Sequence, residues 1–217
     1  EKARSTKNIA CSYRISIAKD GRFFESGNPW KDTYQKQSLE YAKSGEFHYV
    51  VLVDIADFYN QIYHHRLTNN LESANVTEIR AQNIEKFLFN LTGNHHSRGL
   101  PVGPSASILL AEACLIDIDE YLQGNGYIHT RYVDDFRIFC KTFQQANTVL
   151  HDISEYLYTA HRLYCQANKT KIQPIEQFAQ LELQDPEQLE NQSKAEKINS
   201  VLAELLNLTG YIYFQED

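Results

Sequence analysis

Two adjacent aspartates, Asp134 and Asp135, lie at the centre of an apolar segment with the composition of a β-hairpin. Residues 127–133 and 136–141 on either side are rich in β-branched and aromatic side chains, which predicts two strands joined at the acidic pair. Neighbouring like charges in a sheet repel each other and are costly to remove from water. A hard divalent cation such as Mg²⁺ or Mn²⁺, which prefers oxygen ligands, would balance them. The alternative is an exposed Asp-Asp turn, a common turn composition.

Length and charge narrow the class of protein. The chain has 217 residues and a formal net charge of −7, so it can bury one core with an appendage. It has no apolar run long enough to span a membrane and no signal-peptide pattern, which predicts a cytoplasmic protein without a membrane partner. The negative charge argues against a broad nucleic-acid-binding surface, although residues 1–22 are rich in Lys and Arg.

Methionine and cysteine usage add two expectations. The chain contains no Met, even at its start, so we expect it to be a piece of a longer protein. Its four cysteines are widely spaced and form no Cys-x-x-Cys pair. This pattern predicts reduced thiols in a cytosolic protein and no zinc site.

Hydrophobic periodicity divides the chain into a strand, helices, a hairpin, a helix and a strand. That order is typical of a split βαβ arrangement, an α+β fold in which helices back an antiparallel sheet. The expected elements are a strand at 47–54, helical segments from 57 and over 76–91, one long helix over 104–123, strands at 127–133 and 136–141, a helix over 143–162, a strand at 171–174 and a charged helix at about 187–208.

A third acid, Asp54, ends the predicted strand at 47–54. A carboxylate at the end of an apolar strand needs a partner. In a split βαβ sheet the first strand can lie beside the hairpin, which would bring Asp54 close to Asp134 and Asp135. Three converging carboxylates can hold two divalent ions, which stabilise the attacking and leaving oxygens in phosphoryl transfer. The alternative role of Asp54 is an N-cap for the helix that follows.

Four segments, in this order, resemble the catalytic motifs of the reverse transcriptases, specifically the palm domain of the bacterial enzymes. Each motif is weak evidence alone, whereas four in the right order are strong evidence. The segments are Asp-Ile-Ala-Asp-Phe-Tyr at 54–59, Arg-Gly-Leu-Pro-Val-Gly-Pro-Ser-Ala-Ser at 98–107, Tyr-Val-Asp-Asp at 132–135 and Asn-Lys-Thr at 168–170.

The resemblance covers roughly residues 10–175. It implies a polymerase palm at 47–175, a partial fingers segment at 1–46, and a helical tail at 176–217 that leads towards a thumb outside this chain. A looser match at 11–14 resembles the end of the preceding fingers motif.

The resemblance implies nucleotidyl transfer. A 3′-hydroxyl, or an equivalent protein hydroxyl, attacks the α-phosphate of a deoxynucleoside triphosphate, and pyrophosphate leaves. The expected partners are deoxynucleoside triphosphates and an RNA or DNA template–primer, while the oligomeric state stays open. The implied catalytic residues are Asp54, Asp134 and Asp135, which together with the Ile55 carbonyl would hold two Mg²⁺ ions, with Mn²⁺ as an alternative. The implied nucleotide-binding residues are Asp57, Phe58, Tyr59, Gly103 and Lys169.

Several of these residues have specific implied roles. Main-chain amides at 57–59 would face the triphosphate, Tyr59 matches the steric gate that excludes a 2′-hydroxyl, and Lys169 matches the lysine that neutralises or protonates the departing pyrophosphate. Gly99 and Gly103 would permit close approach of the backbone to the nucleotide, ahead of a helix N-terminus that favours phosphate. Without the motifs, Tyr59 would be a core aromatic, Lys169 a solvated lysine and the glycine loop an ordinary helix entry.

Val102 departs from the family pattern, which usually has Gln before the second glycine. Losing this hydrogen-bonding side chain near the nucleotide leaves template direction open. The sequence Leu-Pro-Val-Gly-Pro-x-x-Ser at 100–107 resembles a bacterial branch linked to abortive infection and antiphage defence. Some members of that branch make DNA without a template or from a protein primer. The expected function is therefore an RNA-directed DNA polymerase, or an untemplated or protein-primed relative in antiphage defence.

Two other functions compete with this one. RNA-directed RNA polymerases usually carry Gly where Val133 stands and lack a bulky gate, so Val133 and Tyr59 both argue against that activity. A catalytically silent palm, kept as a scaffold or sensor, would have no reason to retain all three carboxylates. The remaining polar candidates are predicted to be surface or loop residues (His64, His65, His95 and His96) and a solvated helix face (Glu112, Asp117 and Asp119).

Overall fold

The computed structural model describes residues 3–16, 21–93 and 96–181. The chain divides into two compact units, residues 1–178 and 179–217, and the account below concerns the first. The helix predicted at 187–208 and nearly all of the tail at 176–217 lie outside the described residues.

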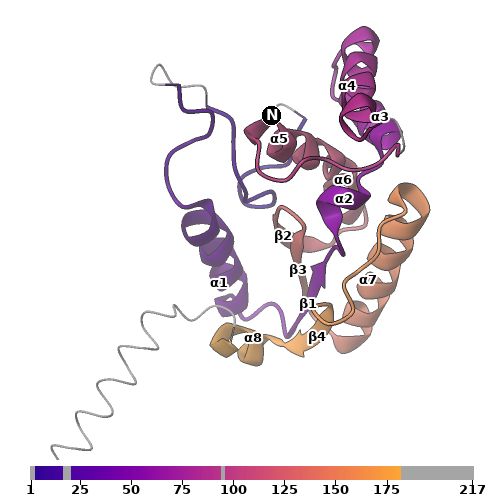
Figure 1. The fold of residues 1–217 in the computed structure, drawn as a ribbon. Helices are drawn as coiled ribbons and strands as arrows, with labels where there is room; N and C mark the ends of the chain where they lie inside the picture. Colours follow the sequence, from indigo (N-terminus) through magenta and orange to yellow (C-terminus); the bar gives the residue numbers. More distant parts are fainter. Residues whose placement is uncertain (1–2, 17–20, 94–95, 182–217) are drawn as a thin grey trace, which may run out of the picture. The chain divides into compact units, whose positions relative to one another are not determined.

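An antiparallel sheet forms the centre of the first unit (Figure 1), with the strand order β2-β3-β1-β4. Strand β1 pairs with β3 on one side and with β4 on the other, and β3 also pairs with β2. Each β-helix-β crossover therefore joins two parallel strands separated by a third, which confirms the predicted split βαβ arrangement. The strands are β1 (Tyr49–Asp54), β2 (Ile128–Tyr132), β3 (Asp135–Cys140) and β4 (Lys171–Pro174).

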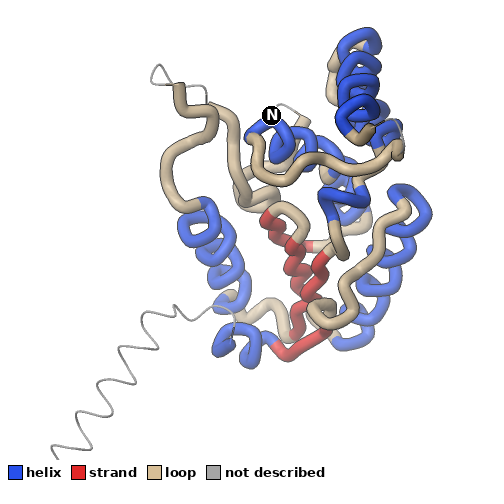
Figure 2. Tube along the Cα trace, in the orientation of Figure 1, coloured by secondary structure: helices blue, strands red, loops and turns tan. Residues whose placement is uncertain are grey.

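Helices lie on both faces of the sheet (Figure 2). One face carries α5 (Ser105–Cys114), α6 (Ile116–Gly124) and α7 (Phe143–Tyr156), which the π-helical turn η2 (Leu157–His161) extends. The other face carries the π-helical turn η1 (Trp30–Gln35), α1 (Lys36–Lys43) and the start of α8 (Ile175–Leu181). Beyond the end of β1 follow α2 (Phe58–Gln61), α3 (His64–Ser73) and α4 (Glu78–Leu91).

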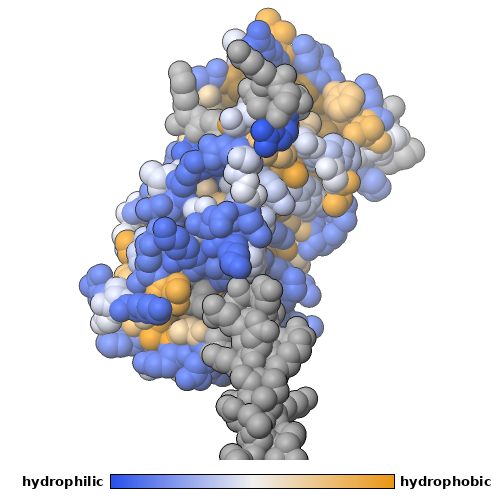
Figure 3. Space-filling model, turned by 90° about the vertical axis from the view of Figure 1, so that its left-hand side faces the viewer, coloured by the Kyte–Doolittle hydropathy of each residue, from blue (hydrophilic) through white to orange (hydrophobic). Residues whose placement is uncertain are grey.

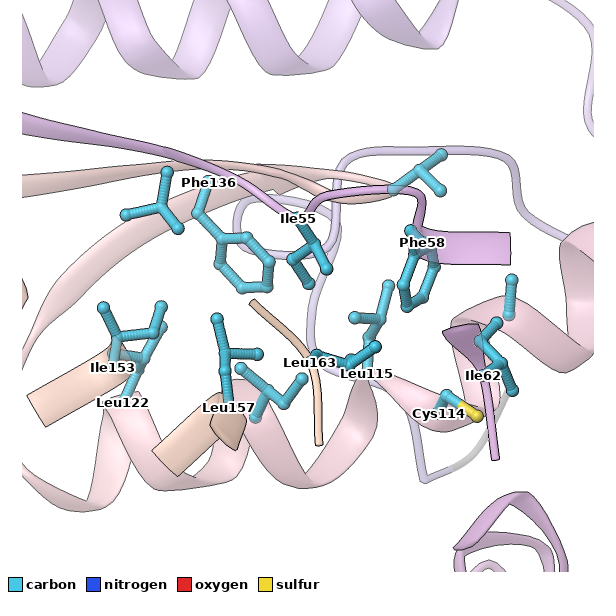
Figure 4. Packing of buried hydrophobic residues seen from close by; sticks show 14 of the residues in the cluster. Ile55, Phe58, Ile62, Cys114, Leu115, Leu122, Phe136, Ile153, Leu157 and Leu163 are labelled. Atoms are coloured by element: carbon cyan, nitrogen blue, oxygen red, sulfur yellow. The ribbon is translucent and has the colours of Figure 1, made fainter. Parts of the chain in front are cut away.

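Side chains alternate between the two faces along each strand. Phe136 and Ile138 belong to the main hydrophobic cluster beneath α6 and α7, and Figure 4 shows Phe136 pointing from the sheet towards Leu122 and Leu157. Burying a side chain of this size contributes roughly 1.5–3 kcal/mol. Phe139 points to the opposite face and contacts the ring of Phe178. Both faces of the sheet are thus buried, as the nearly continuous apolar strands predict.

The predicted helix at 104–123 is in fact two helices, because the chain breaks at Leu115. The Leu115 side chain is completely buried, and its amide bonds back to the carbonyl of Glu112 in a tighter turn, at 3.2 Å. Asn70 on α3 donates to the carbonyls of Ala113 and Cys114, at 3.2 and 3.3 Å. A side chain from another helix thus provides a hydrogen-bond donor to both carbonyls at the break.

Two other segments differ from expectation. The helical pattern that begins at 57 is interrupted between α2 and α3, where Tyr63 forms a β-bridge with Arg98. The segment at 1–46 contains η1 and α1, which periodicity did not indicate because their buried positions are Tyr34 in η1 and polar Ser38 in α1. The predictions for 76–91, 143–162 and 171–174 are confirmed.

The N-terminal segment extends the sheet at its β2 edge. Ala10 forms a parallel β-bridge with Arg131, the Cys11 amide donates to the Arg131 carbonyl, and the Arg131 amide donates to the Ile9 carbonyl, at 2.8 and 2.7 Å. An edge strand covered in this way is protected from pairing with other chains. The face that carries the N-terminal loops and α1 is mostly hydrophilic, with small hydrophobic patches (Figure 3).

Two simpler predictions can be checked directly. All four cysteines are free, and Cys11, Cys114 and Cys140 are buried, which confirms the prediction of reduced thiols. Within the described residues, every helix is too short or too polar to cross a lipid bilayer.

Candidate active site

The hairpin between β2 and β3 turns through only two residues, Val133 and Asp134, because Tyr132 and Asp135 pair directly across it. Val133 has a φ of 54°, in the left-handed region. A β-branched residue rarely adopts this conformation, and it costs roughly 1–3 kcal/mol. The surrounding structure must therefore hold the turn that carries the two aspartates.

Asp54 lies directly opposite Asp135 in the β1–β3 ladder. The Asp54 carbonyl faces the other way, where it accepts a hydrogen bond from the Gln166 amide at 2.8 Å. The Asp54–Asp135 pair is therefore a non-hydrogen-bonded pair of the ladder, the type in which opposing side chains approach most closely. This arrangement confirms the prediction that the first strand brings its terminal acid to the hairpin.

Burial and neighbouring charges shift the pKa values of Asp134 and Asp135. Burial raises the pKa of Asp135 to about 6, and the charges of Asp134 and Asp54 act in the same direction. Burial likewise raises the pKa of Asp134, with a further contribution from Asp54. The end of the sheet therefore concentrates negative charge that the protein only partly compensates.

Lys169 supplies part of that compensation. Its Nζ donates to Oδ1 of Asp54 at 3.0 Å, and this hydrogen bond and the Asp54 charge raise the pKa of Lys169. The lysine side chain is 66 % exposed, whereas that of Asp54 is only 11 % exposed. Lys169 thus reaches from the surface to the buried end of β1, and it contacts a catalytic candidate directly.

The available ligand atoms at this site are all oxygens. The Asp54 carbonyl and the Ala56 amide both bond to the segment at 164–166, so the backbone groups of Ile55 point to the opposite side of the strand, towards β3. Three carboxylates and one carbonyl form a donor set that suits Mg²⁺ or Mn²⁺. Among the described residues, no three His, Cys, Asp or Glu side chains already stand together as a metal-binding group. Cation binding would therefore have to draw the carboxylates together.

Three of the residues predicted to bind the nucleotide, Asp57, Phe58 and Tyr59, follow Asp54 at the start of α2. Asp57, with a φ of 50°, is exposed and accepts hydrogen bonds from the side chains of Asn60 and Gln61, at 2.6 and 3.3 Å. Phe58 is buried in the core, so only its main chain can reach a ligand. The amides of Asn60 and Gln61 donate to the Asp57 carbonyl, both at 3.1 Å, so main-chain contacts to a ligand would have to come from the amides at 57–59.

Tyr59 is half-buried next to the acidic cluster. Burial raises the pKa of its hydroxyl to about 12, and the charges of Glu112 and Asp134 contribute. The hydroxyl is therefore neutral at physiological pH. The backbone of Tyr59 is fixed to the glycine-rich loop, because its carbonyl accepts a hydrogen bond from the Leu100 amide at 2.8 Å.

The loop at 97–103 runs alongside the segment at 59–64 and ends at α5. Gly103 has a φ of 114°, and a Cβ atom at this position would meet no neighbour within 4 Å. Glycine is thus required here by the backbone conformation and not by the closeness of a neighbouring atom. Val102, which replaces the expected Gln, is 75 % exposed.

Comparison with known protein families decides the identity of this site. Residues 10–196 match the family model described as reverse transcriptase (RNA-dependent DNA polymerase). The chain belongs to the reverse transcriptase family. Enzymes of this family are nucleotidyltransferases that use nucleotide substrates and a nucleic-acid template, generally with Mg²⁺. No curated protein matches the chain significantly.

A buried ionic network supports the active hairpin of this reverse transcriptase domain, and sequence reasoning missed it. The side chain of Arg131 is completely buried. It donates to both carboxylate oxygens of Asp119 at 2.8 and 2.7 Å, to Glu112 at 3.0 Å and to the carbonyl of Val133 at 3.1 Å. Burial alone would raise the pKa of Asp119, but the Arg131 charge holds it well below its usual range. Arg131 thus fixes the strained turn to the helices behind the sheet.

The prediction that Glu112, Asp117 and Asp119 form a solvated face is therefore wrong. Glu112 and Asp119 are buried against Arg131, and Asp117 pairs with Arg66 and His161. A sequence signal existed: Glu112 and Asp119 are seven residues apart, and in the predicted continuous helix at 104–123 they would share a face with apolar Leu115.

The histidine predictions have mixed outcomes. His64 is buried, and its Nε2 hydrogen-bonds the Gly99 carbonyl at 2.8 Å, so the prediction of a surface residue is wrong for this position. His65 and His96 are exposed, as predicted. His95 lies outside the described residues.

Proposed function

We propose that this chain is the catalytic core of a reverse-transcriptase-type DNA polymerase. A 3′-hydroxyl attacks the α-phosphate of a deoxynucleoside triphosphate, a new phosphodiester bond forms, and pyrophosphate leaves. The observation that carries the proposal is the direct pairing of Asp54 with Asp135 beside the turn that holds Asp134. Acids whose pKa values rise because they are buried together form a site that needs a cationic partner.

Asp54, Asp134, Asp135 and the Ile55 carbonyl would hold two Mg²⁺ ions, or Mn²⁺ in their place. Bound cations of this kind supply positive charge to the attacking and leaving oxygens of phosphoryl transfer. Lys169 has a complementary role: its raised pKa keeps it protonated, so it can neutralise, or donate a proton to, the departing pyrophosphate once it leaves Asp54.

Incorporation of labelled deoxynucleotides in the presence of Mg²⁺ or Mn²⁺ tests the proposal. Reactions with a primer–template and without a template distinguish a copying enzyme from an untemplated one, a choice that exposed Val102 leaves open. The link to a bacterial antiphage branch rests on the sequence around Val102 alone and stays a prediction. The alternative function is a silent scaffold or sensor, which would incorporate no nucleotide under any condition. The ion pair between Lys169 and Asp54 is compatible with that alternative as well.

Tyr59→Val should raise ribonucleotide incorporation relative to deoxynucleotide incorporation by about tenfold or more, because a smaller side chain leaves room for a 2′-hydroxyl. Single-nucleotide extension with matched ribo- and deoxyribonucleotides measures the ratio. Tyr59→Phe is the control, since it keeps the ring and should keep the discrimination. An unchanged ratio in Tyr59→Val would contradict the gate assignment.

Asp135 should make the cation-free protein less stable as the pH rises. Its pKa of about 6 in the folded chain exceeds the ordinary value of 3.8. The folded state therefore binds more protons between these values, and stability falls with rising pH across that window. In EDTA at pH 7.5, Asp135→Asn should raise the Tm by a few degrees, and the gain should vanish near pH 4. An equal gain at both pH values in thermal unfolding would refute this.

A further inference from the structure

A cavity of about 450 Å³ lies between α3, the start of the glycine-rich loop and the end of η2. Three arginines, Arg66, Arg98 and Arg162, contribute to its lining, and no acidic side chain among the residues that the structure describes does. In a chain with a net charge of −7, this is an unusual local concentration of positive charge. The three arginines come from segments far apart in the sequence, so only the fold brings them together.

Two of these arginines are held by neutral groups. Arg98 donates to the side-chain carbonyl of Gln61 at 3.2 Å and lies over the ring of Tyr63, 5.4 Å from its centroid. Arg162 lies over the ring of Tyr158 at 5.0 Å. Within the described ranges, no carboxylate forms an ion pair with either one. Their charges are therefore positioned but not neutralised, which favours an anionic ligand.

The other charged groups around the cavity compensate one another. Arg66 pairs with Asp117, and His161 pairs with the same carboxylate at 3.0 Å. His65 on the rim lies 3.6 Å from Glu85. With neutral histidines, the uncompensated charge in the cavity thus comes from Arg98 and Arg162.

A second cavity of about 700 Å³ shares Tyr63 and Arg98 with the first. Its lining includes the polar residues Asn60, Gln61 and Ser97. The ring of Tyr63, between the two cavities, is 41 % exposed. Positive charge beside an exposed aromatic ring and amide groups is the combination that binds the phosphates and bases of a single strand.

We propose that these two cavities form one groove, here called the Arg98 groove, that binds single-stranded nucleic acid. Phosphates lie at Arg98 and Arg162, and a base stacks near Tyr63. Along the chain the groove adjoins the candidate active site, because Asn60 and Gln61 in its lining directly follow Tyr59. The proposal rests on the proposed function only for the kind of ligand, since a polymerase needs a path for unpaired template or product. It also resolves how an acidic chain can bind nucleic acid: locally, through a few arginines.

Binding of a fluorescent oligothymidylate of about ten nucleotides, followed by anisotropy in EDTA, tests the proposal. Arg98→Ala combined with Arg162→Ala should weaken binding about tenfold or more at low salt, and should reduce the slope of log affinity against log salt by roughly one per arginine. Arg80→Ala combined with Lys86→Ala, two exposed residues of α4, removes the same charge and should change neither quantity appreciably. An equal loss in both double variants, or no loss in the first, would overturn the proposal.

Two further variants separate charge and stacking from structure. Arg98→Lys combined with Arg162→Lys should retain most of the affinity for the oligonucleotide if charge is what matters. Unchanged affinity in the double alanine variant would again overturn the proposal. Tyr63→Ala should weaken binding of the oligonucleotide several-fold without affecting binding of inorganic tripolyphosphate. If the double alanine and double lysine variants both lose affinity for tripolyphosphate but bind the oligonucleotide as the wild type does, the groove binds a polyphosphate and not a nucleic-acid strand. Because no catalysis is involved, the result is independent of whether the chain polymerises nucleotides.

Discussion

Replacing Asp134 and Asp135 together by alanine is expected to reduce deoxynucleotide incorporation by about a thousandfold or more, since lost electrostatic stabilisation of a transition state costs at least that much. The two side chains lie at the hairpin turn and at the first position of β3, facing Asp54. Without them, Asp54 and the Ile55 carbonyl alone would be left to bind the cations. Incorporation of labelled nucleotide by the purified chain, with Mg²⁺ and then Mn²⁺, measures the effect.

A matched control removes two negative charges elsewhere on the protein, the same number as the double aspartate variant. Glu72→Ala combined with Glu120→Ala removes two exposed acids, on α3 and α6, and should leave incorporation unchanged. Equal incorporation by wild type and the double aspartate variant would refute the assigned chemistry. Absence of incorporation from both proteins, under all conditions, would favour the silent scaffold.

The second large effect is on stability. Arg131→Leu is expected to lower the free energy of unfolding by about 3–5 kcal/mol, because it leaves the buried carboxylate of Asp119 without its main partner and removes one of the two arginines that pair with Glu112. Urea denaturation of the purified protein measures this loss. The Val133 carbonyl also loses a hydrogen bond from Arg131, so the strained turn should loosen.

The double substitution Arg131→Leu with Asp119→Leu distinguishes lost pairing from a general packing defect. It removes the most completely buried carboxylate together with its partner, so it should recover part of the stability. Arg80→Leu on the exposed side of α4 is the matched control and should cost less than about 0.5 kcal/mol. A loss below 1 kcal/mol in Arg131→Leu would show that the network contributes little.

Much of the fold could be predicted from local patterns. Apolar runs identified β1 and the hairpin strands, and their order along the chain indicated the split βαβ sheet that the structure confirms. The break at Leu115 could not be predicted in this way, because both halves of the segment have helical periodicity. It depends on Asn70, a residue of another helix, whose side chain donates hydrogen bonds to the carbonyls at the break.

The same distinction applies to the site. Motifs in the sequence are enough to indicate the reaction class that we propose, because the order and spacing of the segments that contain Asp54, Asp134 and Asp135 can be recognised. The groups around these acids became visible only in the folded chain: Lys169 on Asp54, Arg131 behind Val133, and the arginines that meet in the Arg98 groove. The physical reason is that periodicity shows which positions are buried but not which partner a buried or half-buried charge will meet. Those partners come from distant segments, and only packing brings them within hydrogen-bonding distance.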